Sequence, residues 1–152
     1  MERDLISMSN HQILLVEDSA DDADLALRAL KKNSIDVEVV VTRDGVEALE
    51  YLFPVDGEPR TVSLVLLDLK LPRLNGLEVL RCIRADKRTR LIPVVVLSTS
   101  IEPADLAQSY SKGCNSYLRK PIDFREFTGM VQDLARYWLT HNEPPPIVSA
   151  AA

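Results

Sequence analysis

Five polar side chains of this sequence stand at the ends of segments that have the composition of strands: Glu17, Asp18, Asp68, Ser98 and Lys120. The segments before the first four are short apolar runs at residues 13–16, 64–67 and 93–97. Strands covered by helices on both faces have such continuous apolar runs, and ligands of these sheets bind beyond the carboxyl ends of the strands. The pattern predicts a site of three carboxylates, a hydroxyl and an ammonium group at one edge of a sheet.

The expected chemistry of this site depends on its carboxylates. Two carboxylates about 4 Å apart repel each other by about 4 kcal/mol at an effective dielectric constant near 20, so the cluster needs a cation. The three acids offer hard oxygen ligands, and no histidine or cysteine belongs to the set. This donor set favours Mg²⁺ or Mn²⁺ over zinc.

Strand and helix patterns alternate along the chain. The expected strands are residues 13–16, 37–41, 64–67, 93–97 and 115–119, and the expected helices begin near Asp21, Gly45, Leu77, Pro103 and Asp123. Such alternation implies parallel strands joined by right-handed crossovers, which is an α/β three-layer sandwich.

The last expected helix carries an amphipathic stripe of apolar residues: Phe124, Phe127, Val131, Leu134 and Trp138. A helix over residues 123–141 would be about 28 Å long, whereas a five-residue strand covers about 17 Å. Its final turns should therefore extend past the sheet.

The length of 152 residues and a hydrophobic content of 46% predict one domain. We place this domain at residues 11–141, after a flexible leader at residues 1–10. Residues 142–152, which include three consecutive prolines, are expected to form an extended or disordered tail.

Charge and composition disfavour several classes of function. The net charge of −5 disfavours a nucleic-acid surface, which needs clustered Lys and Arg. A basic stretch at residues 81–90 lies where a helix should end, and cations at that end favour a solvated structural role. No apolar stretch is long enough to cross a membrane, and two distant cysteines suit a reducing cytoplasm.

The ordered set of motifs resembles the receiver domain of two-component response regulators. The set consists of Glu17-Asp18, then Asp68 followed by Pro72 and Gly76, then Ser98, and then Lys120-Pro121. Each motif alone is weak, but their order and spacing from residue 12 to about residue 141 are highly specific. The resemblance implies a flavodoxin-like sheet of five parallel strands in the order 2-1-3-4-5.

The resemblance also implies roles for individual residues. Asp68 would accept a phosphoryl group, while Glu17, Asp18, Asp68 and the backbone carbonyl of Lys70 would hold Mg²⁺. Lys120 would pair with the phosphoryl oxygens, and Ser98 would donate a hydrogen bond to one of them. Tyr117 would turn inward after Ser98 moves.

The family also keeps a cis peptide bond before the proline that comes after its lysine, here Pro121, although an ordinary trans bond is the alternative. Asp21, Asp22 and Asp24 favour a different interpretation from the site acids. They lie past the strand end, in the first turn of a helix, where solvated acids suit the helix dipole.

Three features resemble more narrowly the stand-alone regulators of cyanobacterial phytochromes: the segment at residues 56–60, the triplet at residues 98–100 and the pair Tyr137-Trp138. This resemblance implies a phytochrome-type histidine kinase as the phosphoryl donor and an unknown protein as the downstream target. The protein would be an enzyme only in catalysing its own phosphorylation and dephosphorylation.

Two other classes compete with this interpretation. A haloacid dehalogenase type phosphatase needs a second Asp two residues after the nucleophile, where this chain has Lys70. A pseudo-receiver that binds partners without phosphorylation would lack a carboxylate or the lysine, and none is missing.

Self-association is expected through the surface that receivers form from their fourth helix, fifth strand and fifth helix. Tyr137 and Trp138 lie in the part of the last helix that should extend past the sheet, and Leu106 and Tyr110 lie on the preceding helix. Trp and Tyr often anchor interfaces, so we expect a two-fold dimer. The alternative is that Trp138 ends the core stripe and Tyr137 is solvated.

Overall fold

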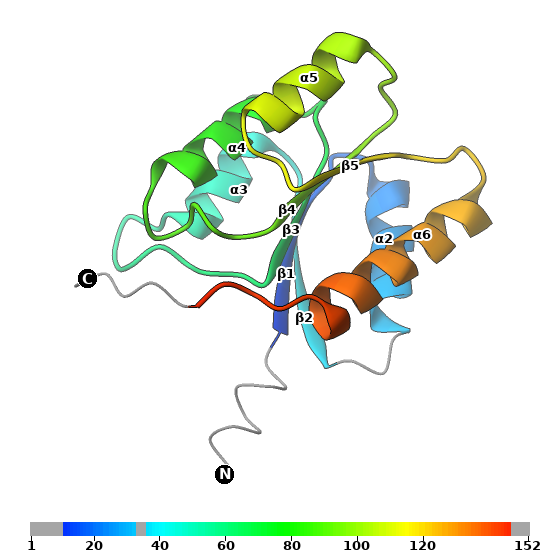
Figure 1. Ribbon diagram of the computed structural model, residues 1–152, viewed down its shortest axis with the longest axis horizontal. Coiled ribbons are helices and arrows are strands. Elements are labelled where there is room, and N and C mark those ends of the chain that lie inside the picture. The colour runs from blue at the N-terminus through cyan, green and yellow to red at the C-terminus, as the bar shows by residue number, and fades with distance from the viewer. Residues whose placement is uncertain (1–10, 33–35, 147–152) are drawn as a thin grey trace.

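The computed structural model describes residues 11–32 and 36–146, which form an α/β three-layer sandwich (Figure 1). The parallel sheet has the order β2-β1-β3-β4-β5, which confirms the predicted fold. Its strands are β1 (His11–Val16), β2 (Val37–Thr42), β3 (Leu64–Leu67), β4 (Val94–Ser98) and β5 (Ser116–Arg119). The expected leader at residues 1–10 lies outside the described residues.

Helices cover both faces of this sheet. They are α2 (Ala20–Lys31), α3 (Gly45–Leu52), α4 (Gly76–Ala85), α5 (Pro103–Ser111) and α6 (Phe124–Arg136), the last of which continues into the π-helix η1 (Tyr137–His141). Figure 1 shows α3, α4 and α5 on one face and α2 with α6 on the other. The central strands β3 and β4 are therefore fully buried, as is most of β1, whereas the edge strands β2 and β5 are only partly covered.

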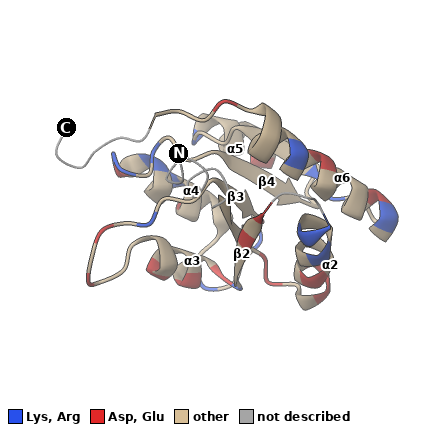
Figure 2. Cartoon of the chain, turned by 90° about the horizontal axis from the view of Figure 1, so that it is seen from below, with Lys and Arg blue, Asp and Glu red and all other residues tan. Residues whose placement is uncertain are grey.

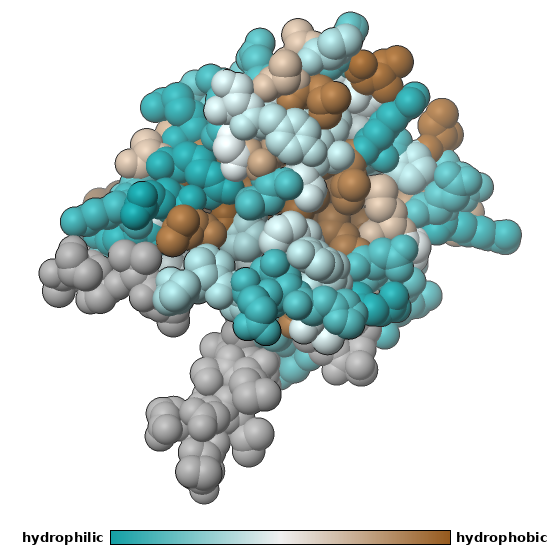
Figure 3. Space-filling model, viewed as in Figure 1, coloured by the Kyte–Doolittle hydropathy of each residue, from teal (hydrophilic) through white to brown (hydrophobic). Residues whose placement is uncertain are grey.

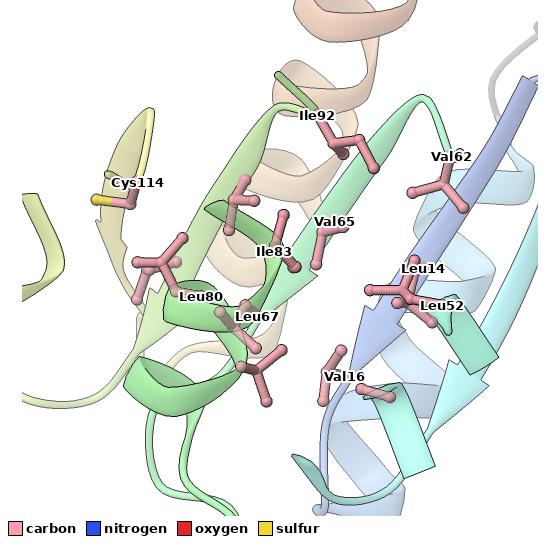
Figure 4. Packing of buried hydrophobic residues seen from close by; sticks show 14 of the residues in the cluster. Leu14, Val16, Leu52, Val62, Val65, Leu67, Leu80, Ile83, Ile92 and Cys114 are labelled. Atoms are coloured by element: carbon pink, nitrogen blue, oxygen red, sulfur yellow. The ribbon is translucent and has the colours of Figure 1, made fainter. Parts of the chain in front are cut away.

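Two hydrophobic clusters fill the spaces between the layers. Alternate residues of one strand enter different clusters: Leu14 and Val16 pack on the side of α3 and α4, whereas Ile13 and Leu15 pack toward α2 and α6. Figure 4 shows the first cluster, with side chains of β1 and β3 directed at those of α3 and α4. This two-sided burial explains why the central strands are continuous apolar runs.

Side-chain caps set the start of four helices. Ser19 accepts a hydrogen bond from the backbone N–H of Asp22 (3.2 Å), and Asn75 accepts one from Glu78 (3.0 Å). The caps of α3 and α6 are Asp44 and Asp123. A cap satisfies backbone donors in the first turn, so these residues fix the helix starts: α2 begins three residues after Glu17 and α4 begins eight residues after Asp68.

The end of the chain differs in part from expectation. Phe124, placed in the core stripe by its spacing, is 58% exposed, because it is the first residue of α6 and lies beyond the sheet. Trp138 is half-buried and packs against the core. Residues 142–146 form no helix or strand, and the rest of the expected tail lies outside the described residues.

Within residues 11–32 and 36–146, no helix is long and apolar enough to span a membrane.

Gly76 allows α4 to start against the backbone that carries Asp68. A Cβ atom on Gly76 would lie 2.2 Å from the carbonyl oxygen of Asp68 and 2.9 Å from Cα of Leu69. The amide of Gly76 also donates to the carbonyl oxygen of Leu69 (2.9 Å). The site loop and the helix can approach this closely only because residue 76 has no side chain.

We predict that Gly76→Ala lowers the free energy of unfolding by about 1–3 kcal/mol, because neighbouring backbone must move. Gly129→Ala is the matched control, since a Cβ atom there meets nothing within 4 Å. Gly129 lies inside α6, so that change should stabilise the protein by about 0.5–1 kcal/mol. Urea unfolding measures both, and equal effects of the two substitutions would contradict the packing argument.

Candidate functional site

Asp68 comes directly after β3, and its backbone still pairs with the neighbouring strand. Its amide donates to the carbonyl oxygen of Val16 (3.1 Å), which continues the pairing between β1 and β3 by one residue. Its side chain is buried, and Oδ1 accepts a long hydrogen bond from the amide of Lys70 (3.4 Å). The carboxylate therefore emerges at the carboxyl end of a central strand, as the sequence predicted.

Glu17 and Asp18 come directly after the neighbouring strand β1. The amide of Glu17 donates to the carbonyl oxygen of Thr42 (2.9 Å), and its Oε2 accepts from the amide of Ser19 (3.1 Å). Glu17 is buried and Asp18 is exposed. Carboxylate oxygens of Glu17, Asp18 and Asp68 lie within 4.8 Å of one another, so the sheet brings the three predicted acids together.

Lys120 places an ammonium group among these carboxylates. Its amide donates to the carbonyl oxygen of Ser98 (2.8 Å), which holds the residue at the end of β5. Its Nζ lies 2.6 Å from Oε1 of Glu17, 3.1 Å from Oδ2 of Asp22 and 3.3 Å from Oδ2 of Asp68. The side chain is buried, so water screens these ion pairs poorly.

Asp22 is a residue of the carboxylate cluster that sequence reasoning missed. We expected a solvated acid in the first turn of a helix, and its side chain is 36% exposed, but one oxygen reaches Lys120. The reason is the position of α2, which starts at Ala20 immediately beyond the end of β1. The available signal in the sequence was that Asp22 follows Asp18 by only four residues, within the first turn of the helix that begins just beyond β1.

Burial and neighbouring charges both change the pKa values of Glu17 and Lys120. The pKa of Glu17 is raised to about 7, mainly by burial and also by the negative charge of Asp68, and the ion pair with Lys120 offsets only part of this rise. For Lys120, burial disfavours the charged form, but its contacts with Glu17, Asp68 and Asp22 outweigh burial and raise its pKa above the ordinary value. Lys120 therefore stays an ammonium ion at physiological pH.

The donor set fits a hard divalent cation. Three carboxylates contact the one ammonium group and a fourth, Asp18, lies beside two of them, so the described part of the site has more acidic than basic side chains. The oxygens of Glu17, Asp18 and Asp68 are close enough together to share one ion, and all are ligands that Mg²⁺ and Mn²⁺ prefer. Lys120 offsets part of the repulsion but leaves Asp18 without an ion-pair partner among the described residues.

Ser98 and Tyr117 belong to one hydrogen-bonded chain. Ser98 is fully buried at the end of β4, and its Oγ accepts from the amide of Ser100 (3.1 Å). The hydroxyl of Tyr117 donates to the carbonyl oxygen of Ser100 (3.0 Å), so both predicted switch residues contact the same neighbour. Their side chains are thus linked through a single residue of the loop after β4.

The same hydrogen-bonded chain continues to the loop after Asp68. Oγ of Ser100 donates to Oδ2 of Asp105 (2.5 Å), and that carboxylate lies 3.5 Å from Nζ of Lys70. The Ser100 hydrogen bond and the charge of Lys70 lower the pKa of Asp105. Lys70 therefore joins the first turn of α5 to the site loop. Sequence reasoning did not assign Ser100 or Asp105 any role.

The peptide bond between Lys120 and Pro121 is trans, as no cis bond occurs among the described residues. The bond therefore differs from the cis form that the resemblance implies. Lys120 nevertheless reaches three carboxylates, because the buried side chain extends toward β1 and β3 from the end of β5.

Comparisons with known proteins agree with this fold. Residues 13–132 match the response regulator receiver domain family. The chain is 41% identical over 130 residues to the response regulator Rcp1 of Synechocystis sp., covering 84% of this chain and 88% of Rcp1. It is 43% identical over 134 residues to the probable methanogenesis regulatory protein FilR2 of Methanothrix harundinacea, covering 88% of this chain and 86% of that protein.

Solved structures give the same result. The Mn(2+)-bound form of Rcp1 superposes with a TM-score of 0.81 at 38% identity, over 90% of this chain and 99% of the other. The phosphorylated cyanobacterial phytochrome response regulator RcpA superposes with a TM-score of 0.83 at 37% identity, with the same two coverages. Together, the parallel sheet and its acidic edge define a signalling receiver.

The chain belongs to the response regulator receiver domain family. Its relatives include the cyanobacterial phytochrome response regulator RcpA, which confirms the narrower resemblance found in the sequence.

The raised pKa of Glu17 predicts a specific pH dependence of stability in the absence of divalent ions. The folded pKa of about 7 lies above the ordinary value of 4.5, so folding favours the protonated acid. The stability that this group contributes is present at low pH and is lost as pH rises from about 4.5 through about 7. Glu17→Gln should flatten the pH profile over this range.

Thermal unfolding in EDTA between pH 5 and pH 8 measures this effect. Glu38→Gln is a control, because Glu38 is exposed on the edge strand β2 and lies outside the site. A profile that keeps its full slope in Glu17→Gln would contradict the assignment.

Proposed function

We propose that this protein is a phosphorylation switch in which Asp68 accepts a phosphoryl group from a histidine kinase. The observation that carries the proposal is the contact between Asp68 and Lys120 inside the acidic cluster. A carboxylate alone would repel a phosphoryl dianion, whereas an ammonium group 3.3 Å from its Oδ2 can pair with the incoming oxygens.

The proposed reaction is a transfer between two protein side chains. An oxygen of Asp68 attacks the phosphorus of phosphohistidine, an O–P bond forms as the P–N bond breaks, and the imidazole leaves. The product is an acyl phosphate. Catalysis of such transfers consists mostly of positioning and charge stabilisation, which the buried strand end and Lys120 supply.

Glu17, Asp18, Asp68 and the backbone carbonyl of Lys70 are the proposed ligands of Mg²⁺, with Mn²⁺ able to replace it. When bound, the ion neutralises the clustered carboxylates and the charge of the phosphoryl oxygens. The Mn(2+)-bound form of Rcp1 and the acidic cluster of this chain support this assignment. Beyond its own phosphorylation and dephosphorylation, we assign the protein no enzymatic activity.

Ser98 and Tyr117 are the proposed switch residues. The Ser98 hydroxyl accepts a hydrogen bond from Ser100 but keeps its own hydrogen for a phosphoryl oxygen. A movement of Ser98 toward Asp68 would strain its bond to Ser100, which also holds the Tyr117 hydroxyl. The phosphoryl group would thus alter the surface of β5 and α5.

A phytochrome-type sensor kinase is the proposed donor, because the similar proteins Rcp1 and RcpA are described as response regulators, RcpA as that of a cyanobacterial phytochrome. We infer a cytoplasmic protein that signals to a downstream protein target. Lys and Arg positions lie beside Asp and Glu positions on α2 and α6 in Figure 2. Arg88, in the basic stretch after α4, is paired with Glu58 and Asp86, which favours protein partners over nucleic acid.

Incubation with acetyl phosphate and Mg²⁺ should add one phosphoryl group to the wild-type chain, and Asp68→Asn should add none. Intact mass spectrometry decides the assignment. The Asp18→Ala variant should require a higher Mg²⁺ concentration to reach the same extent of phosphorylation, because a proposed ligand is lost. Asp21→Ala is its matched control, as an exposed acid of α2 without a contact to Lys120.

Full incorporation of a phosphoryl group into the Asp68→Asn variant would show that Asp68 is not the acceptor. Transfer from a phosphorylated phytochrome-type kinase, compared with kinases of other types, tests the proposed donor separately.

A two-fold dimer is the proposed assembly, through α5, β5 and the end of the last helix. Leu106, Tyr110 and Tyr137 are 43%, 52% and 50% exposed, and apolar surface gathers over α5 and β5 in Figure 3. Trp138 is half-buried, and its ring meets that of Tyr137 edge to face at a centroid distance of 5.1 Å. Trp138 would therefore support Tyr137 rather than reach far into the partner.

The double substitution Tyr110→Ala/Tyr137→Ala should weaken dimerisation about tenfold or more, because exposed aromatic anchors contribute most to such interfaces. Light scattering after size exclusion, with and without phosphorylation, measures it. Phe124→Ala is the control, as an equally exposed aromatic in a groove between α2 and α6. A wild-type protein that is monomeric in both states excludes this dimer.

A further inference from the structure

A cavity of about 170 Å³ lies at the end of the molecule opposite Asp68. Its walls include His11 of β1, Ser63 just before β3 and Pro93 just before β4, so it lies at the amino ends of the strands. The segment after η1 crosses these strand ends in Figure 1 and closes one side with Asn142 and Pro144. The cavity is thus a built feature of the sheet edge and the C-terminal segment.

The interior of this cavity is apolar. Val62, Ile92 and Leu139 line it together with the ring of Trp138. Val62 and Ile92 are buried, and Trp138 and Leu139 pack against the core, so the rigid part of the protein supports these walls. Trp138 and Leu139 belong to the π-helix η1, and π-helical turns are rare and frequent at functional sites.

The polar groups of the lining are biased toward positive charge. Lys87, Arg88 and His11 line the cavity, whereas no Asp or Glu does among the described residues. This bias is notable in a chain of net charge −5. Arg88 is engaged by Asp86 and Glu58, but Lys87 makes no ion pair within residues 11–32 and 36–146. Lys87 therefore offers a cation to an anionic ligand at the rim.

We propose that this cavity binds a small apolar carboxylic acid, with its ring or chain against Trp138 and Ile92 and its carboxylate at Lys87. An apolar cavity of about 150 Å³ accommodates one six-membered ring, so a cavity of about 170 Å³ suits a single ring with an acidic substituent. Convergent polar groups at the rim of an apolar pocket fix the orientation of such ligands.

This site is separate from the phosphorylation site. Asp68 and Lys120 lie at the carboxyl ends of the strands, and β1, with six residues, spans about 20 Å between the two edges. A ligand here would not touch the carboxylate cluster. The proposal therefore stands or falls independently of the phosphoacceptor assignment, and Asp68→Asn should bind the ligand as well as wild type does.

Trp138 is the only tryptophan in the sequence and supplies the measurement. Titration with cyclohexanecarboxylate, which does not absorb near tryptophan, should change the intrinsic fluorescence and shift the single indole N–H signal in NMR spectra. Saturation is expected with a Kd on the order of 0.1–1 mM, as for good ligands of this size. Cyclohexylmethylamine, of similar shape but opposite charge, should bind at least about tenfold more weakly.

Lys87→Glu should reverse the preference for the acid over the amine and weaken the binding of cyclohexanecarboxylate by about tenfold or more. Lys87 is exposed, so the substitution leaves the core intact. Arg90→Glu makes the same charge change at an exposed position outside the cavity lining and should stay within about twofold of wild type. The proposal is overturned by the absence of saturable binding, by equal affinity for acid and amine, or by equal effects of the two charge reversals.

Discussion

The buried ammonium group of Lys120 is the interaction on which the acidic edge of this protein depends. Three carboxylates from two segments of the chain converge on it within 3.3 Å, and two of those residues are themselves buried. Removing one partner from such a cluster leaves an uncompensated charge in a medium of low dielectric constant. The lysine therefore acts as an internal counter-ion that allows the site to exist before any ligand arrives.

The strand order of the sheet explains why these side chains converge: they follow neighbouring strands and need no long loops to bring them together. β1 and β3 are neighbours, so the acids at their carboxyl ends emerge side by side, and β4 and β5 bring Ser98 and Lys120 to the same edge. Ser19 caps a helix that begins three residues after Glu17, and the longer loop after Asp68 returns to it at Gly76, whose backbone packs directly on that of Asp68. Backbone hydrogen bonds at Glu17, Asp68 and Lys120 extend the strand pairing by one residue each and hold the side chains in place.

Local sequence pattern was sufficient to predict the five strands, their parallel arrangement and the residues at their ends. It could not predict contacts that depend on how a helix is oriented. Asp22 reaches Lys120 because of the position of α2, and Phe124 is exposed because α6 begins beyond the sheet. Arg84, expected on a solvated basic face, is half-buried and donates to Gly113 and Ile92, because α4 packs beside the loops that flank β4.

The polar chain from Ser98 to α5 shows how a charge at this edge can act at a distance. Ser100 contacts Ser98 through its amide, Tyr117 through its carbonyl oxygen and Asp105 through its hydroxyl. A displacement of Ser98 must therefore change the geometry of at least one bond to β5 or α5, because one residue makes all three. A full shift between two such states needs about 5.5 kcal/mol of differential interaction. In the proposed phosphorylated state, charge-assisted hydrogen bonds of the dianion to Ser98 and Lys120 would supply much of this energy, since both side chains are buried.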